Sequence, residues 1–172
     1  SMHYLGDHFD IHCGGVDNIF PHHENEIAQS CAFTDTHFVN YWLHNEHLLV
    51  EGQKMSKSKG NFYTLRDLLE KGFSAEALRY TLLSTHYRSK LNFTIEKVGI
   101  AQKAINKLRE LKRRLEKATL KSDSKSIDSE SEVMLEKFSL KLSDDLNISG
   151  ALGELFIWAN SLFSLLDKDV IG

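Results

Sequence analysis

The chain has 172 residues, of which 41% are hydrophobic and 26% are charged, the composition of a globular protein with one domain or two small ones. A net charge of −3 argues against a dedicated nucleic-acid binder, and two cysteines are too few for a disulfide-stabilised scaffold, so the cytoplasm is the expected compartment. The apolar runs look too short to span a membrane and no signal-peptide pattern opens the chain, so we expect no membrane partner.

The chain up to about Asn61 predicts a small α/β unit. Alternation over residues 8–12 predicts a strand that enters a glycine turn at Gly14–Gly15. Pro21, the only proline, suits the first turn of a helix that continues to about Phe33. Two further strands are expected, over residues 38–43 and 48–50.

The segment Lys54-Met55-Ser56-Lys57-Ser58, continued by Lys59-Gly60, has the composition of a phosphate-binding loop. Two ammonium groups stand three residues apart beside two hydroxyl groups, and a glycine ends the loop. Compact cations and hydroxyl donors suit the spread negative charge of a polyphosphate. The segment follows the predicted strand 48–50 directly, and open α/β sheets bind ligands at such strand ends. The alternative is a solvated surface turn.

Two other groups of residues could bind ligands. His22 and Glu26 are four residues apart, so they project from one face of the predicted helix and can share a metal ion. Imidazole and carboxylate are ordinary zinc ligands, although two ligands do not close a tetrahedral site, and a surface or capping pair is the alternative. Gly14-Gly15 with Asp17 describes a turn that can approach a nucleotide and bind its ribose hydroxyls, but it also describes any tight turn.

From Thr64 onward the sequence predicts only helices. Thr64 with Asp67 forms a capping-box pattern, and Ser74 and Thr94 are candidate N-caps. The helix after Thr94 has an apolar stripe opposite a basic face, which can lie along a phosphate backbone or simply be solvated. Residues 121–129 are rich in serine and have little to bury, so a linker or mobile loop is expected there. Two more helices are expected, over about 130–142 and 150–166.

Six segments resemble the cysteinyl-tRNA synthetases, a family of class I aminoacyl-tRNA synthetases, in the family's order and at similar spacing. The segments are Phe9–His12, Gly14–Asp17, Phe20–Ser30, the KMSKS segment Lys54–Ser58, His86–Ser89 and Asp144–Asn147. The resemblance implies an α/β piece of a Rossmann-like catalytic domain followed by an all-α stem-contact and helical-bundle region. The implied divisions are residues 1–63 for the C-terminal part of the catalytic domain with the KMSKS loop, 64–118 for stem-contact helices, 119–131 for a linker or mobile loop, and 132–172 for the start of a helical tRNA-binding domain.

The same resemblance implies ATP-dependent ligation of L-cysteine to tRNA(Cys) through a cysteinyl-adenylate, with Zn²⁺ recognising the thiolate and Mg²⁺ accompanying ATP. His22 and Glu26 would hold the zinc ion with two cysteines from earlier in the family's chain, and His12 would lie at the substrate pocket. Lys54 and Lys57 would be the catalytic residues. The implied ATP-binding residues are Gly14, Gly15, Asp17, Lys54, Ser56, Lys57 and Ser58. The implied tRNA contacts are Arg66, Arg79, Arg88, Arg113 and Arg114.

The chain contains no His-x-Gly-His motif, which a class I synthetase needs. The resemblance therefore implies a fragment that lacks residues before Ser1 and beyond Gly172 and is inactive on its own. Cys13 departs from the glycine that the family most often has there, and we expect it to be a small buried residue rather than a ligand. Two alternatives stay open: a cysteine:amino-sugar ligase of the same superfamily, and a helical RNA-binding module without catalysis.

Overall fold

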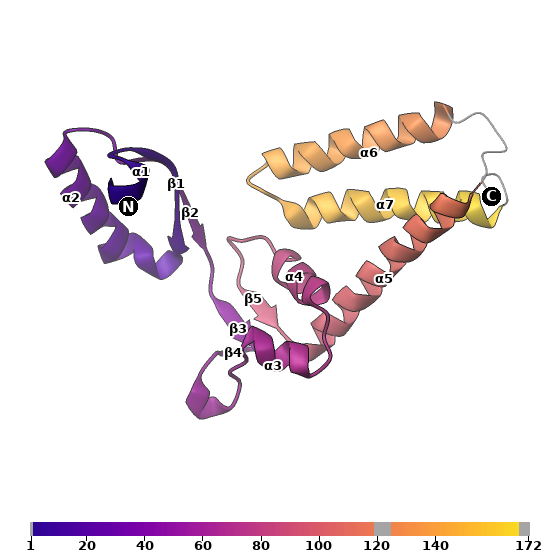
Figure 1. Ribbon diagram of the computed structural model, residues 1–172, viewed down its shortest axis with the longest axis horizontal. Helices are drawn as coiled ribbons and strands as arrows, with labels where there is room; N and C mark the ends of the chain where they lie inside the picture. The colour runs from indigo at the N-terminus through magenta and orange to yellow at the C-terminus, as the bar shows by residue number, and fades with distance from the viewer. Residues whose placement is uncertain (1, 119–124, 169–172) are drawn as a thin grey trace. The chain divides into compact units, whose positions relative to one another are not determined.

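The computed structural model describes residues 2–118 and 125–168 (Figure 1). The chain divides into two compact units, of which the first comprises the residues up to Leu49 with Tyr87–Leu91. The second comprises Val50–His86 and the residues from Asn92 onward. The elements of each unit are described separately.

The first unit is built on a parallel pair of strands. After the short helix α1 (Met2–Leu5), β1 (Phe9–Gly15) pairs with β2 (Val39–Asn45), with Phe9 opposite Val39 and Gly15 opposite Asn45. Parallel strands need a crossover, and it is made by two short helical turns, η1 (Val16–Asn18) and η2 (Ile19–His23), and by α2 (Glu24–Thr34). Buried Phe38 and Val39 pack beneath these elements.

One prediction for the first unit needs correction. Gly14 and Gly15 are the last residues of β1, not a turn after it. Pro21 stands in a first helical turn that leads into α2, as predicted, because Phe20 is the one residue of η2 with non-helical backbone angles (φ −131°, ψ 133°). A residue that precedes proline is driven out of the α region by the proline ring, so a continuous helix cannot pass through Phe20.

A second sheet has the strand order β4-β3-β5, formed by β3 (Leu48–Val50), β4 (Gln53–Lys54) and β5 (Leu91–Phe93). Glu51 and Gly52 connect β3 to β4 and both have positive φ, 50° and 74°. Positive φ at both central residues defines a type I′ hairpin turn. The KMSKS segment therefore does not follow strand 48–50 directly, since a hairpin turn and Gln53 intervene. Lys54 lies on β4, and η3 (Lys57–Lys59) follows.

The remainder is helical, as predicted: α3 (Leu65–Glu70), α4 (Ala75–Leu83), α5 (Ile95–Lys117), α6 (Lys125–Ser143) and α7 (Ile148–Asp167). The three predicted N-terminal caps are confirmed. The Thr64 hydroxyl accepts from the Asp67 N–H while the Asp67 carboxylate accepts from the Thr64 N–H. The hydroxyls of Ser74 and Thr94 likewise accept backbone N–H groups of the first turns of α4 and α5.

Helices α5, α6 and α7 share a core in the second unit, and Figure 1 shows α6 and α7 running side by side. Its buried members are Leu111, Ala159, Leu162 and Leu166. α7 has the length and mean hydropathy of a possible membrane span. Three of its four buried residues, Ala159, Leu162 and Leu166, belong to this helical core.

The predicted linker 119–131 is wrong in its second half. Residues 119–124 lie outside the described part of the chain, but α6 already begins at Lys125. Ile127 packs against the core, and the Ser131 hydroxyl accepts a hydrogen bond from the indole N–H of Trp158 at 3.2 Å. Ile127 and the Ser131 hydroxyl thus connect this serine-rich stretch to the helical core.

His86, the first residue of the motif 86–89, meets the motif 144–147 in the second unit. The segment 144–147 connects α6 to α7, and Asp145 and Leu146 have φ near +50°. The carbonyl oxygen of Asp145 lies 2.9 Å from Nε2 of His86, while the Asn147 side chain accepts from the Gly150 N–H and caps α7. The bond between His86 and Asp145 thus joins the α6–α7 connection to the residues that follow α4.

Candidate functional site

The strand register of the first unit gathers imidazoles on one face. His12 lies opposite Trp42 and Gly14 opposite His44 on the parallel pair β1–β2. Side chains alternate along a strand, so these four positions lie on the same face of the pair. Cys13 points to the opposite face, where it is exposed together with Ile11, which is why the prediction of a buried Cys13 is wrong.

The crossover brings further ligand-type side chains to that face. Glu26 lies in the first turn of α2, and its Oε2 is 2.8 Å from Nε2 of His12. Its other oxygen, Oε1, is 3.7 Å from Nε2 of His22, the partner predicted from the four-residue spacing. The carboxylate of Glu26 is therefore divided between two imidazoles, and the side chain of His22 is 64% exposed.

His23 completes the cluster, and sequence reasoning did not single it out. Its ring is buried, and its Nδ1 lies 2.8 Å from Nε2 of His44. The ring also contacts Trp42, with the ring centroids 4.9 Å apart. Burial first, and then the neighbouring imidazoles of His12 and His44, lower the pKa of His23. The motif has two adjacent histidines, and nothing in the sequence indicates that His23, rather than His22, is the buried one.

Gly14 has a local packing reason to be glycine. A Cβ on Gly14 would lie 2.6 Å from Cε1 of His23, a distance that real Cβ atoms essentially never show. A Cβ on Gly15 would meet the carboxylate of Asp17. The buried His23 ring requires glycine at position 14, whereas the exposed Asp17 side chain can rotate away from a Cβ at position 15. Their predicted contacts with a nucleotide stay a prediction.

The donors of this cluster fit a zinc ion. Ligand atoms of His12, His23 and Glu26 all lie within 4.8 Å of one another. Two ligands of a tetrahedral zinc ion are about 3.4 Å apart, since each bond is about 2.0–2.1 Å long. The 3.7 Å between His22 and Glu26 Oε1 is close to that separation, whereas the 2.8 Å between His12 and Glu26 Oε2 is a hydrogen bond. The group with mutually close ligand atoms thus consists of His12, His23 and Glu26 and does not include His22, so the pair His22 and Glu26 stays a prediction.

The KMSKS loop lies in the second unit. Lys54, Lys57 and Ser58 are exposed, and the hydroxyl oxygens of Ser56 and Ser58 are 2.9 Å apart. The ammonium of Lys57 lies 5.3 Å from the ring centroid of Phe62, a cation–π contact. The loop therefore presents the cations and hydroxyls that the sequence predicted for a phosphate site. The histidine cluster belongs to the first unit.

The five arginines predicted to contact tRNA differ in their surroundings. Arg66 and Arg79 are exposed on α3 and α4. Arg88 donates from Nε to the Tyr87 hydroxyl at 2.9 Å. The two of these five that lie on α5 are engaged in ion pairs: Arg113 with Glu110 at 2.6 Å and Arg114 with Asp167 at 2.8 Å. The basic face of α5 is thus partly neutralised by carboxylates of the same unit, which the sequence did not reveal.

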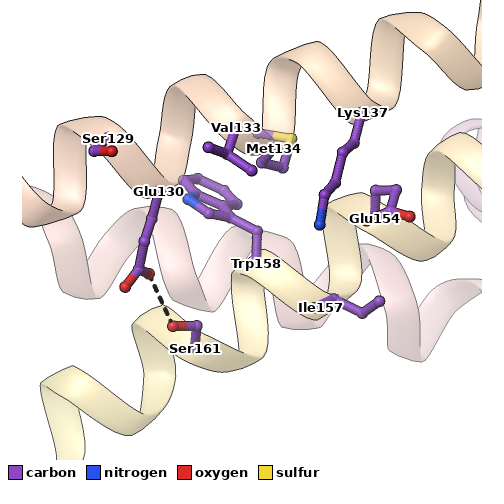
Figure 2. A pocket seen from close by; sticks show the side chains of 9 residues that line it. All are labelled: Ser129, Glu130, Val133, Met134, Lys137, Glu154, Ile157, Trp158 and Ser161. Atoms are coloured by element: carbon purple, nitrogen blue, oxygen red, sulfur yellow. Dashed lines mark hydrogen bonds between the residues drawn. The ribbon is translucent and has the colours of Figure 1, made fainter.

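A hollow of about 280 Å³ lies between α6 and α7, away from the KMSKS loop in the sequence (Figure 2). Figure 2 shows the ring of Trp158 beside Val133 and Met134, and Ser161 donates to Glu130 at 3.1 Å. Its lining is mainly apolar, and it contains none of the residues predicted to bind ATP, zinc or tRNA.

Comparison with solved structures shows the fold. A ternary complex of LeuRS with tRNA and LeuAMS from Agrobacterium radiobacter K84 matches with a TM-score of 0.73 and 18% identity, over 94% of this chain and 23% of the other. Methionyl-tRNA synthetase of Mycobacterium tuberculosis bound by methionyl-adenylate matches with a TM-score of 0.66 and 18% identity, over 91% of this chain and 34% of the other. The predicted fold class, an α/β catalytic-domain piece followed by helices, is confirmed.

Comparison with known sequences is more specific. Proteins called cysteine–tRNA ligase match with 56% identity in Brachyspira hyodysenteriae and 51% in Chlamydia felis, each over 98% of this chain. The chain spans about a third of the length of these curated relatives, 36% in both cases. The family model described as "tRNA synthetases class I (C) catalytic domain" matches residues 1–103. That match covers more than half of the chain, which therefore belongs to the class I (C) tRNA synthetase catalytic-domain family.

Proposed function

We propose that the protein to which this chain belongs is a cytoplasmic cysteine–tRNA ligase. It joins L-cysteine to ATP to give cysteinyl-adenylate and then transfers the cysteine to tRNA(Cys). Relatives of that name, 49–56% identical along nearly all of this chain, support the proposal. The observation that carries it is the Glu26 carboxylate, held at 2.8 Å by His12 while its second oxygen lies 3.7 Å from His22.

His22 and Glu26 are the proposed zinc ligands in this chain. Zinc, when bound there, would accept the thiolate of cysteine, a ligand that the hydroxyl of serine replaces poorly. His12 bonds Oε2 of Glu26 and so fixes the carboxylate with Oε1 toward His22. His23 is hydrogen-bonded to His44, and the His23 ring, 4.9 Å from that of His12 between centroids, restricts where His12 can lie.

The KMSKS loop is the proposed site of charge stabilisation during adenylate formation. An oxygen of the cysteine carboxylate attacks the α-phosphorus of ATP, and pyrophosphate leaves with the electrons of the broken P–O bond. Lys54 and Lys57 would offset the charge on the departing phosphates, which Mg²⁺ would accompany, and the hydroxyls of Ser56 and Ser58 would donate to them. Gly14, Gly15 and Asp17 would lie toward the nucleoside, as their family motif implies.

The helical residues are the proposed tRNA-facing part, with 64–118 contacting the stem and the helices from 132 onward beginning a tRNA-binding domain. Arg66, Arg79 and Arg88 are the proposed phosphate contacts. Arg113 and Arg114 would have to exchange their carboxylate partners for phosphate. We therefore propose that they contribute less to the affinity for tRNA. Such contacts position the RNA rather than read its sequence.

Cysteine-dependent exchange of pyrophosphate into ATP by the full-length protein tests this function. We expect exchange with cysteine, little with serine, and one zinc ion per protein that His22→Ala removes. The exposed His47→Ala serves as the matched control, because His47 is outside the cluster. We also expect no exchange by the 172-residue chain alone. Charging of an amino sugar instead of tRNA, or salt-dependent tRNA binding without any exchange, would overturn the proposal in favour of the corresponding alternative.

A further inference from the structure

Asn61 stands just after the glycine that ends the KMSKS loop, and its half-buried side chain reaches back across the loop. Its Oδ1 accepts a hydrogen bond from the backbone N–H of Ser56 at 2.9 Å. Its Nδ2 donates to the carbonyl oxygens of Lys54 at 3.2 Å and of Val50 at 3.3 Å. One amide group thus holds three separate points of the backbone.

The identity of the side chain is fixed by this pattern. Exchanging Oδ1 with Nδ2 would set the amide NH₂ against an N–H and the amide oxygen against two carbonyls, so only one orientation satisfies all three groups. Aspartate could accept from Ser56 but could not donate to Lys54 or Val50. The site therefore needs one acceptor and two donors on a short side chain, which asparagine supplies.

The three bonds connect the exposed loop to a buried residue. Val50 is only 2% exposed, so its carbonyl is a fixed point on β3. Lys54 and Ser56 precede the loop helix η3, and Gly60, with φ 68°, turns the chain back so that Asn61 can reach them. The ends of the loop are thus tied together and to β3, while the side chains of Lys54 and Lys57 stay exposed.

We propose that Asn61 is a positioning residue of the KMSKS loop. Its amide fixes the backbone from which Lys54, Ser56 and Lys57 extend, so the loop meets ATP already ordered rather than ordering on contact. Asn61 touches neither ATP nor cysteine in this account and acts through Lys57 and Lys54. The inference rests on the proposed phosphate-binding function of the loop. The three hydrogen bonds of Asn61 to Val50, Lys54 and Ser56, called the Asn61 clasp below, can be measured without ATP.

Two isosteric variants test the clasp. Asn61→Asp keeps the bond to Ser56 and loses both donated bonds. Asn92→Asp is the matched control, because Oδ1 of Asn92 accepts from the Gly52 N–H at 2.7 Å at the neighbouring hairpin turn, and aspartate retains that acceptor. Both changes add one negative charge beside the same sheet, so the added charge is controlled.

For Asn61→Asp we expect trypsin, without ATP, to cut after Lys54, Lys57 or Lys59 roughly ten times faster than in the unmodified protein. In the full-length protein we expect kcat for pyrophosphate exchange to fall about 10- to 100-fold with an unchanged KM for cysteine, the loss expected from small misplacement of a catalytic group. Asn92→Asp should change the cleavage rate and kcat by less than about twofold, the size expected of a surface change that keeps the bond from the Gly52 N–H.

The outcomes separate the clasp from the function of the loop. If Lys57→Ala lowers exchange but Asn61→Asp changes neither cleavage nor kcat, the clasp is wrong and the function stands. If Lys57→Ala leaves exchange unchanged, the phosphate function of the loop is wrong, and the cleavage rate alone decides the clasp. Should Asn61→Asp fail to fold, amide hydrogen exchange of the unmodified chain decides: we expect the Ser56 amide to exchange more slowly than that of Ser58, and equal rates would overturn the clasp.

Discussion

Gly14 determines where the His23 ring can lie, and the consequence is testable by a single methyl group. In Gly14→Ala the new Cβ would stand 2.6 Å from Cε1 of His23, so the ring must shift and disturb its contacts with His12 and His44. We expect destabilisation of about 1–3 kcal/mol, the usual cost of overpacking, and weaker zinc binding.

Urea unfolding and zinc titration of Gly14→Ala check this expectation. Gly153→Ala is the control, because no atom lies within 4 Å of its added Cβ. Unchanged stability and zinc affinity in Gly14→Ala would contradict the packing role of this glycine.

The buried ring of His23 also predicts a pH dependence of stability. Burial and the neighbouring imidazoles lower its pKa from the ordinary 6.5. As the pH drops below 6.5, His23 becomes protonated in the unfolded chain but stays neutral in the folded chain. The free energy of unfolding therefore falls as the pH drops from 6.5 toward the lowered pKa. Urea unfolding at several pH values should show a shallower fall in His23→Asn. The exposed His47→Asn should keep the full slope, and an identical slope in all three proteins would argue against this assignment.

At the scale of elements, backbone conformation decides whether a glycine-to-alanine change raises or lowers the free energy of unfolding. Gly153 lies inside α7, where alanine is the better helix former, so Gly153→Ala should stabilise the chain by about 0.5–1 kcal/mol. Gly52 has φ 74° in the hairpin turn before β4, a region that disfavours a side chain, so Gly52→Ala should destabilise by about 1–2 kcal/mol.

Thermal unfolding of the two alanine variants is the measurement. Neither added Cβ meets an atom within 4 Å, so steric contact does not distinguish the two sites. Shifts of the same sign would mean that the turn is not held in the left-handed conformation.

The helices and their caps were predictable because their signals are local. Thr64, Ser74 and Thr94 begin helices where a hydroxyl precedes an apolar repeat, and the structure confirms all three. The start of α6 was not predictable, since Ile127 and Ser131 fold only against α7. Tertiary contact overrides a weak local preference in such a segment.

At the scale of the whole molecule, the ligand-type residues of each motif could be found from the sequence but their partners could not. The spacing of His22 and Glu26 placed them within 3.7 Å, as expected for adjacent helical turns. The bond of His23 to His44 and that of Asn61 to Val50 join residues 21 and 11 positions apart, beyond the reach of a helical or strand repeat. The carboxylates that pair with Arg113 and Arg114 include one from the same helix and one from α7.

The different surroundings of the arginines predict unequal contributions to tRNA binding by the full-length protein. Arg66→Gln should reduce the slope of log affinity against log salt by about 1, the value for one lost phosphate contact. Arg113→Gln should change it less, because Glu110 already neutralises that guanidinium. Filter binding at several salt concentrations measures both slopes, and a larger effect of Arg113→Gln would contradict the proposed ranking.

The parallel pairing of β1 with β2 makes the histidine cluster sensitive to changes in chain length. His12 and Gly14 share a face with Trp42 and His44 only in the observed pairing. A one-codon insertion inside Val39–Asn45 would turn the following side chains to the other face of the pair, moving His44 away from His23. The same insertion beside Asp35, at the end of α2, would leave the alternation within β2 intact. An in-frame insertion within β2 should therefore disrupt the histidine cluster, whereas one in the connection before it should be tolerated. Neither insertion replaces a residue of the cluster.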